Sequence, residues 1–124
     1  MVSINIVEIP SRNLERALAF YARVFELPLE ITEIDDQRMV FMTPDDAAAE
    51  GAALAITEGD DYAPSGEGVR VYLTVDDLEG ILARVVDAGG EIAAEIDAVE
   101  GWGRYAAFRD LEGTVIGITQ PPTD

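Results

Sequence analysis

The stretch VRVYLTVDDLEGIL, residues 69–82, decides the fold, because a closely related stretch stands 64 residues earlier in the chain. That earlier copy is NIVEIPSRNLERAL, residues 5–18. In each copy a β-branched segment precedes apolar residues spaced three and four apart, which is the pattern of a strand followed by an amphipathic helix. The unchanged residues are Val7, Leu14, Glu15, Leu18 and Ala19, which return as Val71, Leu78, Glu79, Leu82 and Ala83. The repeat predicts two equal modules with a shared cavity at their junction.

Length and composition favour one globular domain. The chain has 124 residues, of which 48% are hydrophobic, which is enough for a hydrophobic core without disulfides or structural metals. It has no cysteine and no apolar run long enough to span a membrane, and its N-terminus lacks a signal-peptide pattern. These features predict a cytoplasmic protein without a membrane partner.

The charge narrows the classes of partner. Twenty-five acidic residues oppose eight basic ones, all of them arginine, for a net charge of −17. A nucleic-acid partner is excluded, because phosphates need basic neutralisation, and an anionic membrane surface is disfavoured for the same reason. A field of this sign attracts cations and repels anions. The alternative is that the charge only keeps the protein soluble in its host.

The chain also has no histidine. Histidine is the usual metal ligand and the usual general acid or base near neutral pH. Nucleophilic Ser–His and Cys–His arrangements are therefore excluded, as is a histidine zinc site. Any catalysis would depend on carboxylates, tyrosine, arginine or an added cofactor.

The first module, residues 1–58, is predicted to run strand, helix and three strands. Pro10 should close the first strand, and Ser11 or Asn13 should cap the helix that ends before Pro28. The predicted strands are residues 4–9, 29–34, 38–43 and 52–57, with a turn over 44–51.

A linker over residues 59–68 separates this module from the second, residues 69–124, because it holds glycine, proline and acidic residues with little to bury. In the second module Asp76 and Glu79 are predicted to form a capping box at the start of the helix, and Gly89-Gly90 should stop it. The predicted strands are residues 69–75, 91–96, 105–109 and 115–120. The predicted fold class is α+β, with two βαβββ modules that form a paired half-barrel.

Strand alternation assigns one face of each sheet to the helices and the other to the concave surface. The concave set comprises Ile4, Ile6, Glu8, Arg70, Tyr72 and Thr74 from the first strands, and Ala53, Ala55, Thr57, Val115, Gly117 and Thr119 from the closing strands.

Three stretches resemble the vicinal oxygen chelate superfamily, which groups glyoxalase I, extradiol dioxygenases, and fosfomycin- and bleomycin-resistance proteins. They are IPSRNLERALAFYARVF, VYLTVDDLEGILARVVDAGG and WGRYAAFRDLEGTVIGITQP, which with the repeat cover nearly the whole chain. The closing Asp-Pro-x-Gly-Asn motif of that family appears here as Asp110-Leu111-Glu112-Gly113-Thr114, with the proline and asparagine replaced.

The resemblance implies four positions for a divalent metal in the enzymes of the family. In this chain they fall at Ile6, Ala55, Arg70 and Gly117, none of which can chelate through its side chain. Glu8 lies near them, but one carboxylate is a poor site for a dication that takes six or more oxygens. The resemblance therefore favours a branch without metal or cofactor and disfavours metal-dependent lyase or dioxygenase activity.

Bleomycin-resistance proteins share with this chain the run Trp102-Gly103-Arg104 and an acidic character. The resemblance implies a homodimer that holds a cationic or aromatic small molecule between aromatic walls. An alternative is that Trp102 fills the module junction, although the glycines beside it favour an exposed turn.

The predicted ligand-binding residues are Arg70, Tyr72, Trp102, Tyr105, Phe41 and Glu8. Arg70 either binds a ligand anion or pairs with Glu8, and the tyrosines either stack on the ligand or pack internally. Three functions stay open: a metal-free binding protein that sequesters a compound, a glyoxalase- or dioxygenase-like enzyme with non-histidine metal ligands, and an accessory subunit with a vestigial cavity.

Overall fold

The computed structural model describes residues 2–44 and 52–122, which divide into two compact units. The first unit comprises residues 1–22 and 26–64, and the second comprises residues 23–25 and 65–124. The boundary near residue 64 falls within the predicted linker.

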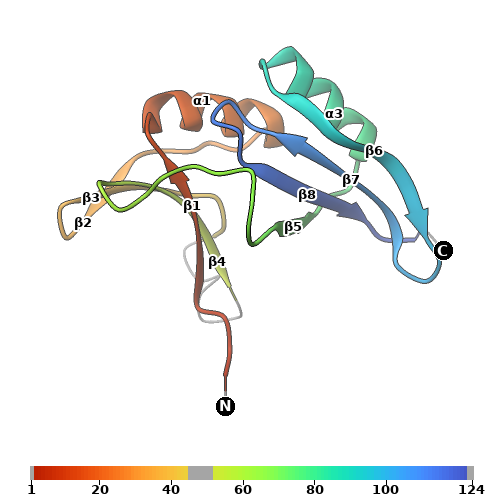
Figure 1. The fold of residues 1–124 in the computed structure, drawn as a ribbon, viewed down its shortest axis with the longest axis horizontal. Coiled ribbons are helices and arrows are strands. Elements are labelled where there is room, and N and C mark those ends of the chain that lie inside the picture. The colour runs from red at the N-terminus through yellow and green to blue at the C-terminus, as the bar shows by residue number, and fades with distance from the viewer. Residues whose placement is uncertain (1, 45–51, 123–124) are drawn as a thin grey trace. The chain divides into compact units, whose positions relative to one another are not determined.

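The first unit is a four-stranded sheet with a helix between its first two strands (Figure 1). The strands lie in the order β1-β4-β3-β2, with β1 parallel to β4 and the other neighbours antiparallel. The bounds are β1 Ile6–Ser11, α1 Leu14–Phe25, β2 Thr32–Ile34, β3 Gln37–Phe41 and β4 Ala53–Glu58.

The second unit repeats this plan. Its sheet has the order β5-β8-β7-β6, with β5 parallel to β8 and the other neighbours antiparallel. The bounds are β5 Val71–Thr74, α3 Leu78–Asp87, β6 Glu91–Val99, β7 Gly103–Arg109 and β8 Val115–Gln120. The prediction of an α+β fold with βαβββ written twice is confirmed, and the described strands form two open sheets without a closed barrel.

Both helices begin at a side-chain cap at the same place in the repeat. The Asn13 side chain accepts a hydrogen bond from the Arg16 amide, and that of Asp77 accepts one from the Gly80 amide, each at 3.1 Å. Such caps satisfy an amide that has no partner inside the helix. The prediction of a capping box at Asp76 is wrong by one residue, because Asp77 is the residue that corresponds to Asn13.

The end of α3 confirms the predicted stop at Gly89-Gly90. The amide of Gly90 donates to the Val85 carbonyl at 2.9 Å, and that of Gly89 donates to the Val86 carbonyl at 3.1 Å. Gly89 has φ 98°, the left-handed conformation that glycine adopts without strain. This pair of bonds is the Schellman motif that ends many helices.

Seven of the eight predicted strands differ from the observed strands by one to three residues at one end or both. Strand β1 continues through Pro10 to Ser11, which is tolerated because β1 lies at a sheet edge. Strand β2 holds only residues 32–34, and β6 extends to Val99 with two irregularities in its pairing to β7. Residues 45–51 of the predicted turn lie outside the described residues.

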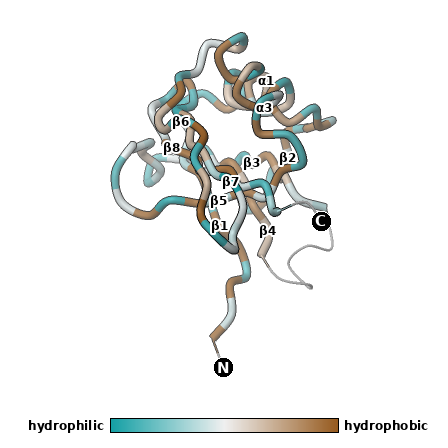
Figure 2. Tube along the Cα trace, turned by 90° about the vertical axis from the view of Figure 1, so that its right-hand side faces the viewer, coloured by the Kyte–Doolittle hydropathy of each residue, from teal (hydrophilic) through white to brown (hydrophobic). Residues whose placement is uncertain are grey.

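Each unit buries its own apolar layer. In the first unit this layer includes Leu14 of α1 with Val40 and Ile56 of the sheet, and in the second it includes Leu78 of α3 with Phe108 and Ile118. Both helices carry hydrophobic and hydrophilic residues, as expected for amphipathic helices with one buried face (Figure 2).

Among the described residues, no helix is long and apolar enough to cross a membrane.

Candidate functional site

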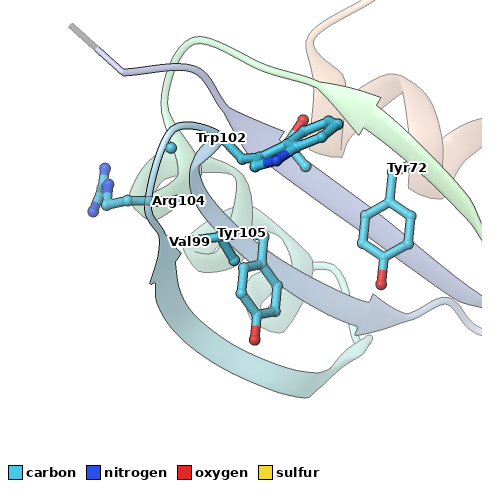
Figure 3. A pocket seen from close by; sticks show the side chains of 7 residues that line it. Tyr72, Val99, Trp102, Arg104 and Tyr105 are labelled. Atoms are coloured by element: carbon cyan, nitrogen blue, oxygen red, sulfur yellow. The ribbon is translucent and has the colours of Figure 1, made fainter.

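The second unit has a hollow on the sheet face opposite to α3, with a volume of about 630 Å³. Binding pockets for small molecules typically measure roughly 300–1,000 Å³. Its lining comes from β5, β7, β8 and the β6–β7 turn: Tyr72, Val99, Trp102, Gly103, Arg104, Tyr105 and Thr119. The three predicted aromatic residues of this unit are therefore brought together (Figure 3).

Trp102 stands on the turn between β6 and β7, and 80% of its surface is exposed. Its amide donates to the Val99 carbonyl at 3.0 Å, which closes the turn. The next residue, Gly103, has φ 100°, and a Cβ there would press against the carbonyl oxygen of Gln120 and lie 3.0 Å from Cα of Pro121. Only glycine fits at this point, so the backbone fixes where the indole emerges.

Tyr72 lies on the neighbouring part of the same face. It is the register partner of Gly117 on the parallel strand β8. A Cβ built on Gly117 would lie within 2.7 Å of three atoms of the Tyr72 ring. The ring therefore occupies the space of the missing side chain, while 51% of the residue stays exposed.

Tyr105 completes the aromatic lining. It pairs in register with Thr119 on one side and with Asp97 of β6 on the other, so these side chains share the face of the hollow. Hydroxyls of Tyr72, Tyr105 and Thr119 can donate to a ligand, and Asp97 places a carboxylate beside the aromatic lining.

Arg104 contributes to the lining, but its side chain points away from the aromatic group (Figure 3). Its guanidinium donates to both carboxylate oxygens of Glu79, at 2.6 and 2.9 Å, and to Oε1 of Gln120 at 3.1 Å. The hydrogen bonds from Arg104 lower the pKa of Glu79 to about 2, and those to Glu79 raise the pKa of Arg104. Its charge is thus engaged by Glu79.

In the first unit, the Glu8 carboxylate is bound by two hydroxyls. Thr57 Oγ1 donates to Oε2 at 2.6 Å, and the Tyr62 hydroxyl donates to Oε1 at 2.9 Å. The bond to Glu8 and burial raise the pKa of Tyr62. The contact with Thr57 confirms that these two residues share a sheet face. The predicted alternative in which Glu8 pairs with Arg70 joins the two units and stays a prediction.

The other predicted residues lie outside the aromatic hollow. Arg70 is exposed and precedes β5, which begins at Val71. Phe41 lines a separate groove of about 320 Å³ in the first unit, with neighbours that include Leu27 and Met42. That all six predicted residues contact one ligand therefore stays a prediction.

Sequence reasoning missed three residues, Tyr62, Val99 and Asp97. Tyr62 lies in the predicted linker, whose polar composition gave no reason to expect a contact. Its being the sole aromatic residue of that linker is the signal that could have indicated one. Val99 was missed because β6 was predicted to end at residue 96. A strand that runs to the Glu100-Gly101 turn would have placed it on the pocket face.

The four positions at which the resemblance places metal ligands do not fit a cation. The space beside Gly117 is taken by the Tyr72 ring, and Ala55 is fully buried with only a methyl group. Over residues 2–44 and 52–122, no three Asp, Glu, His or Cys side chains are grouped so that they could hold a metal ion. Dications need several oxygen, nitrogen or sulfur ligands, which these positions do not supply.

The fold described above agrees with that of a known superfamily. The family model of the Glyoxalase/Bleomycin resistance protein/Dioxygenase superfamily matches residues 3–118. The chain belongs to this superfamily.

Two solved structures illustrate the likeness. The chain is similar to TnmS3, an antibiotic binding protein from Streptomyces sp. CB03234, with 25% identity, coverage of 98% of both chains and a TM-score of 0.70. It also shares its fold with a glyoxylase/bleomycin resistance protein/dioxygenase domain from Frankia sp. EAN1pec, with 15% identity, coverage of 98% of this chain and 99% of that one, and a TM-score of 0.71.

A sequence relative is CFP32 of Mycobacterium tuberculosis, a protein named as a glyoxylase. The two are 33% identical over 52 residues, which amount to 42% of this chain. The match spans only 20% of that protein's length.

Proposed function

We propose that this protein binds a small aromatic molecule, neutral or cationic, in the aromatic hollow of the second unit and sequesters it without a metal. The observation that carries the proposal is Trp102, the sole tryptophan of the chain, which is 80% exposed at the rim of a hollow that Tyr72 and Tyr105 also line. Large aromatic surfaces left open beside a concavity are typical of binding sites.

The charges near the hollow support this choice of ligand. Arg104, the one charged residue of the lining, is held by Glu79, while Asp97 is aligned with Tyr105. The net charge of −17 adds a long-range preference for cations. A cation over an aromatic face gains about 0.5–2 kcal/mol. An anionic aromatic compound should therefore bind more weakly than a cation of the same shape.

The similarity to TnmS3, an antibiotic binding protein, supports a sequestering role over a catalytic one. The proposal keeps the sequence-based expectations of a cytoplasmic location and a homodimer. Light scattering in solution tests the dimer, and a monomeric mass would remove that part of the proposal.

A thermal-shift screen tests the proposed function. We expect proflavine, a planar cation, and glycopeptide antibiotics such as bleomycin to include compounds that raise the melting temperature of the wild type. Trp102→Ala should reduce that shift. A shift that survives this substitution unchanged would refute the stacking role of Trp102.

The same assay tests the enzyme alternative. Mn²⁺, Ni²⁺, Zn²⁺ and Fe²⁺ should each leave the melting temperature unchanged, because the ligand positions of the family hold no chelating groups. Stoichiometric metal in the purified protein, lost with activity on chelation, would overturn the proposal in favour of a metal-dependent enzyme.

A further inference from the structure

We infer that Gly117 is a specificity-determining residue: because it has no side chain, the Tyr72 ring lies against β8 and forms the floor of a site that selects flat ring systems. This inference rests on the proposed function and names the shape of the ligand that the hollow takes.

The geometry at Gly117 supports a role for the missing side chain and not for an unusual backbone. The φ angle of Gly117 lies outside the left-handed region that favours glycine, so alanine has no conformational penalty there. The space for a Cβ is instead filled by Cδ1, Cε1 and Cγ of the Tyr72 ring. A methyl group at this position must displace the ring.

The position of the ring matters for a ligand because Tyr72 is held on one side and open on the other. Its Gly117 side is covered, whereas about half of the residue is exposed at the hollow that Trp102 also lines. A side chain that is fixed before binding loses less entropy when a ligand stacks on it. A displaced ring loses that advantage and intrudes into the hollow.

The equivalent place in the first unit is built differently. There Glu8 is the register partner of Ala55 on the parallel strand β4. Ala55 carries a methyl group, and the side chain opposite to it turns to the hydroxyls of Thr57 and Tyr62. The flat aromatic floor thus belongs to the unit in which the closing strand has glycine.

A purely structural explanation predicts a different result. An aromatic residue that covers a strand glycine can stabilise the sheet without any ligand. Under that explanation Gly117→Ala lowers the melting temperature but leaves ligand affinity and ligand shape preference unchanged. The test therefore measures affinity as well as stability.

The experiment is a double-mutant cycle on the full chain, with wild type, Gly117→Ala, Tyr72→Ala and the double variant. Affinity is measured by calorimetry for proflavine, a planar cation, for acridine, a planar ring system without a fixed charge, and for 1-adamantanamine, a bulky cation. We expect wild type to bind the two planar probes and to bind 1-adamantanamine at least about tenfold more weakly, the scale of one aromatic stack.

Gly117→Ala should lower the affinity for both planar probes about tenfold when Tyr72 is present, because the methyl group displaces the ring. In the Tyr72→Ala background the same methyl group should change affinity less than about twofold, since no ring remains to displace. Equal effects of the methyl group in both backgrounds, or wild-type affinity in Gly117→Ala, would overturn the inference.

A readout without ligand separates this inference from the proposed function. In the unliganded wild type, the Gly117 Hα protons should be shielded by the Tyr72 ring and should return to ordinary shifts in Tyr72→Ala. If no probe binds wild type, the proposed function and the specificity role both fail, while this shielding shows that the ring placement itself holds. If probes bind but the shielding is absent, the proposed function stands and the inference about Gly117 is wrong.

Discussion

The two units place different chemistry on the same backbone position. In the first unit Glu8 is the register partner of Ala55, and in the second Tyr72 is the register partner of Gly117. Glu8 and Tyr72 correspond in the sequence repeat. One is a carboxylate satisfied by two neighbouring hydroxyls, and the other is an aromatic ring that covers a glycine.

The parts that hold each helix to its sheet have instead kept their chemistry. In the first unit Glu58 accepts from the Leu14 amide at 3.0 Å and from Arg38 at 2.8 Å. In the second unit Gln120 accepts from the Leu78 amide at 3.0 Å and from Arg104 at 3.1 Å. The arginines also bind Glu15 and Glu79 in the first turns of the helices. We call each set of arginine, closing-strand acceptor and helix glutamate a clasp.

Caps and clasps recur in both units, whereas the side chains on the opposite sheet face differ. We call the capped helix, its clasp and the buried layer beneath it the frame of each unit. Caps and clasps act where a helix meets the end of a closing strand, and Arg104 of the second clasp also contributes to the lining of the hollow. A substitution on the pocket face is therefore expected to alter the proposed ligand binding at little cost to the fold, whereas a substitution beneath a helix is expected to destabilise the fold first.

The largest expected effect breaks the frame in either unit. Leu14→Ala and Leu78→Ala each remove a fully buried side chain at the same repeat position. Each should lower the free energy of unfolding by about 2–5 kcal/mol, from lost burial and the cavity left behind. Urea unfolding measures both. A cost near zero at one of the two positions would show that the frames are not equivalent.

Acid should weaken the clasp of the second unit. Arg104 holds the pKa of Glu79 at about 2, below the ordinary value of 4.5. Because the folded pKa is lowered, this contribution to stability is present above pH 4.5 and is lost as pH falls from 4.5 towards 2. Carboxyl NMR titration measures the pKa directly, and urea midpoints across this range measure the stability.

Arg104→Gln is the variant that tests this cause, with Arg38→Gln as the matched change in the first unit. The first should return the pKa of Glu79 towards 4.5, and the second should do the same for Glu15, whose pKa Arg38 lowers. An unchanged pKa of Glu79 in Arg104→Gln would contradict the assignment. Both pairs are solvent-exposed, so the effect on stability should be small.

A smaller effect is expected at Tyr62 of the first unit. Its partner Glu8 occupies the position that corresponds to Tyr72 on the pocket face of the second unit. The bond to Glu8 raises the pKa of Tyr62 above the ordinary value of 10. Since the folded pKa is raised, the contribution is present below pH 10 and is lost as pH rises through the folded pKa. NMR titration of the Tyr62 ring resonances should show a pKa above 10, and Glu8→Gln should lower it. A titration curve that is the same in both proteins would argue against the bond.

The smallest expected effect on stability is that of Trp102→Ala. Because 80% of Trp102 is exposed, its removal should change the free energy of unfolding by no more than about 0.5 kcal/mol. Urea unfolding of Trp102→Ala and of Leu78→Ala compares the free-energy cost of a pocket-face substitution with that of a frame substitution. A loss comparable to that of Leu78→Ala would mean that Trp102 belongs to the frame.

The repeat predicted most of the fold because it encodes the frame. The spacing of Leu14 and Leu78 with their neighbours gave both helices, and strand alternation placed Tyr72, Gly117 and Thr119 on one face. Boundaries failed where tertiary context decides: Pro10 is accepted in β1 only because that strand lies at an edge. The predicted cap was Asp76 and the observed cap is Asp77. The prediction failed because either aspartate satisfies the local pattern.

The site could be predicted only in part, because the sequence alone does not show which residues of neighbouring strands lie side by side on one face of the sheet. Tyr72, Trp102 and Tyr105 were predicted together and line one hollow. The packing of the Tyr72 ring on Gly117 depends on the register of β5 and β8, which one sequence does not fix. The bond between Glu8 and Tyr62 was hidden for a similar reason, because it spans 54 residues.

An NMR titration of the full chain with proflavine tests most directly the claim that the second unit carries the recognition face. Amide and aromatic resonances of Tyr72, Trp102, Tyr105 and Thr119 are predicted to shift in a saturable manner, with the Leu14 and Leu78 amides of the two frames unaffected. Saturable shifts confined to Glu8, Phe41 and their neighbours in the first unit, with none around Trp102, would contradict it.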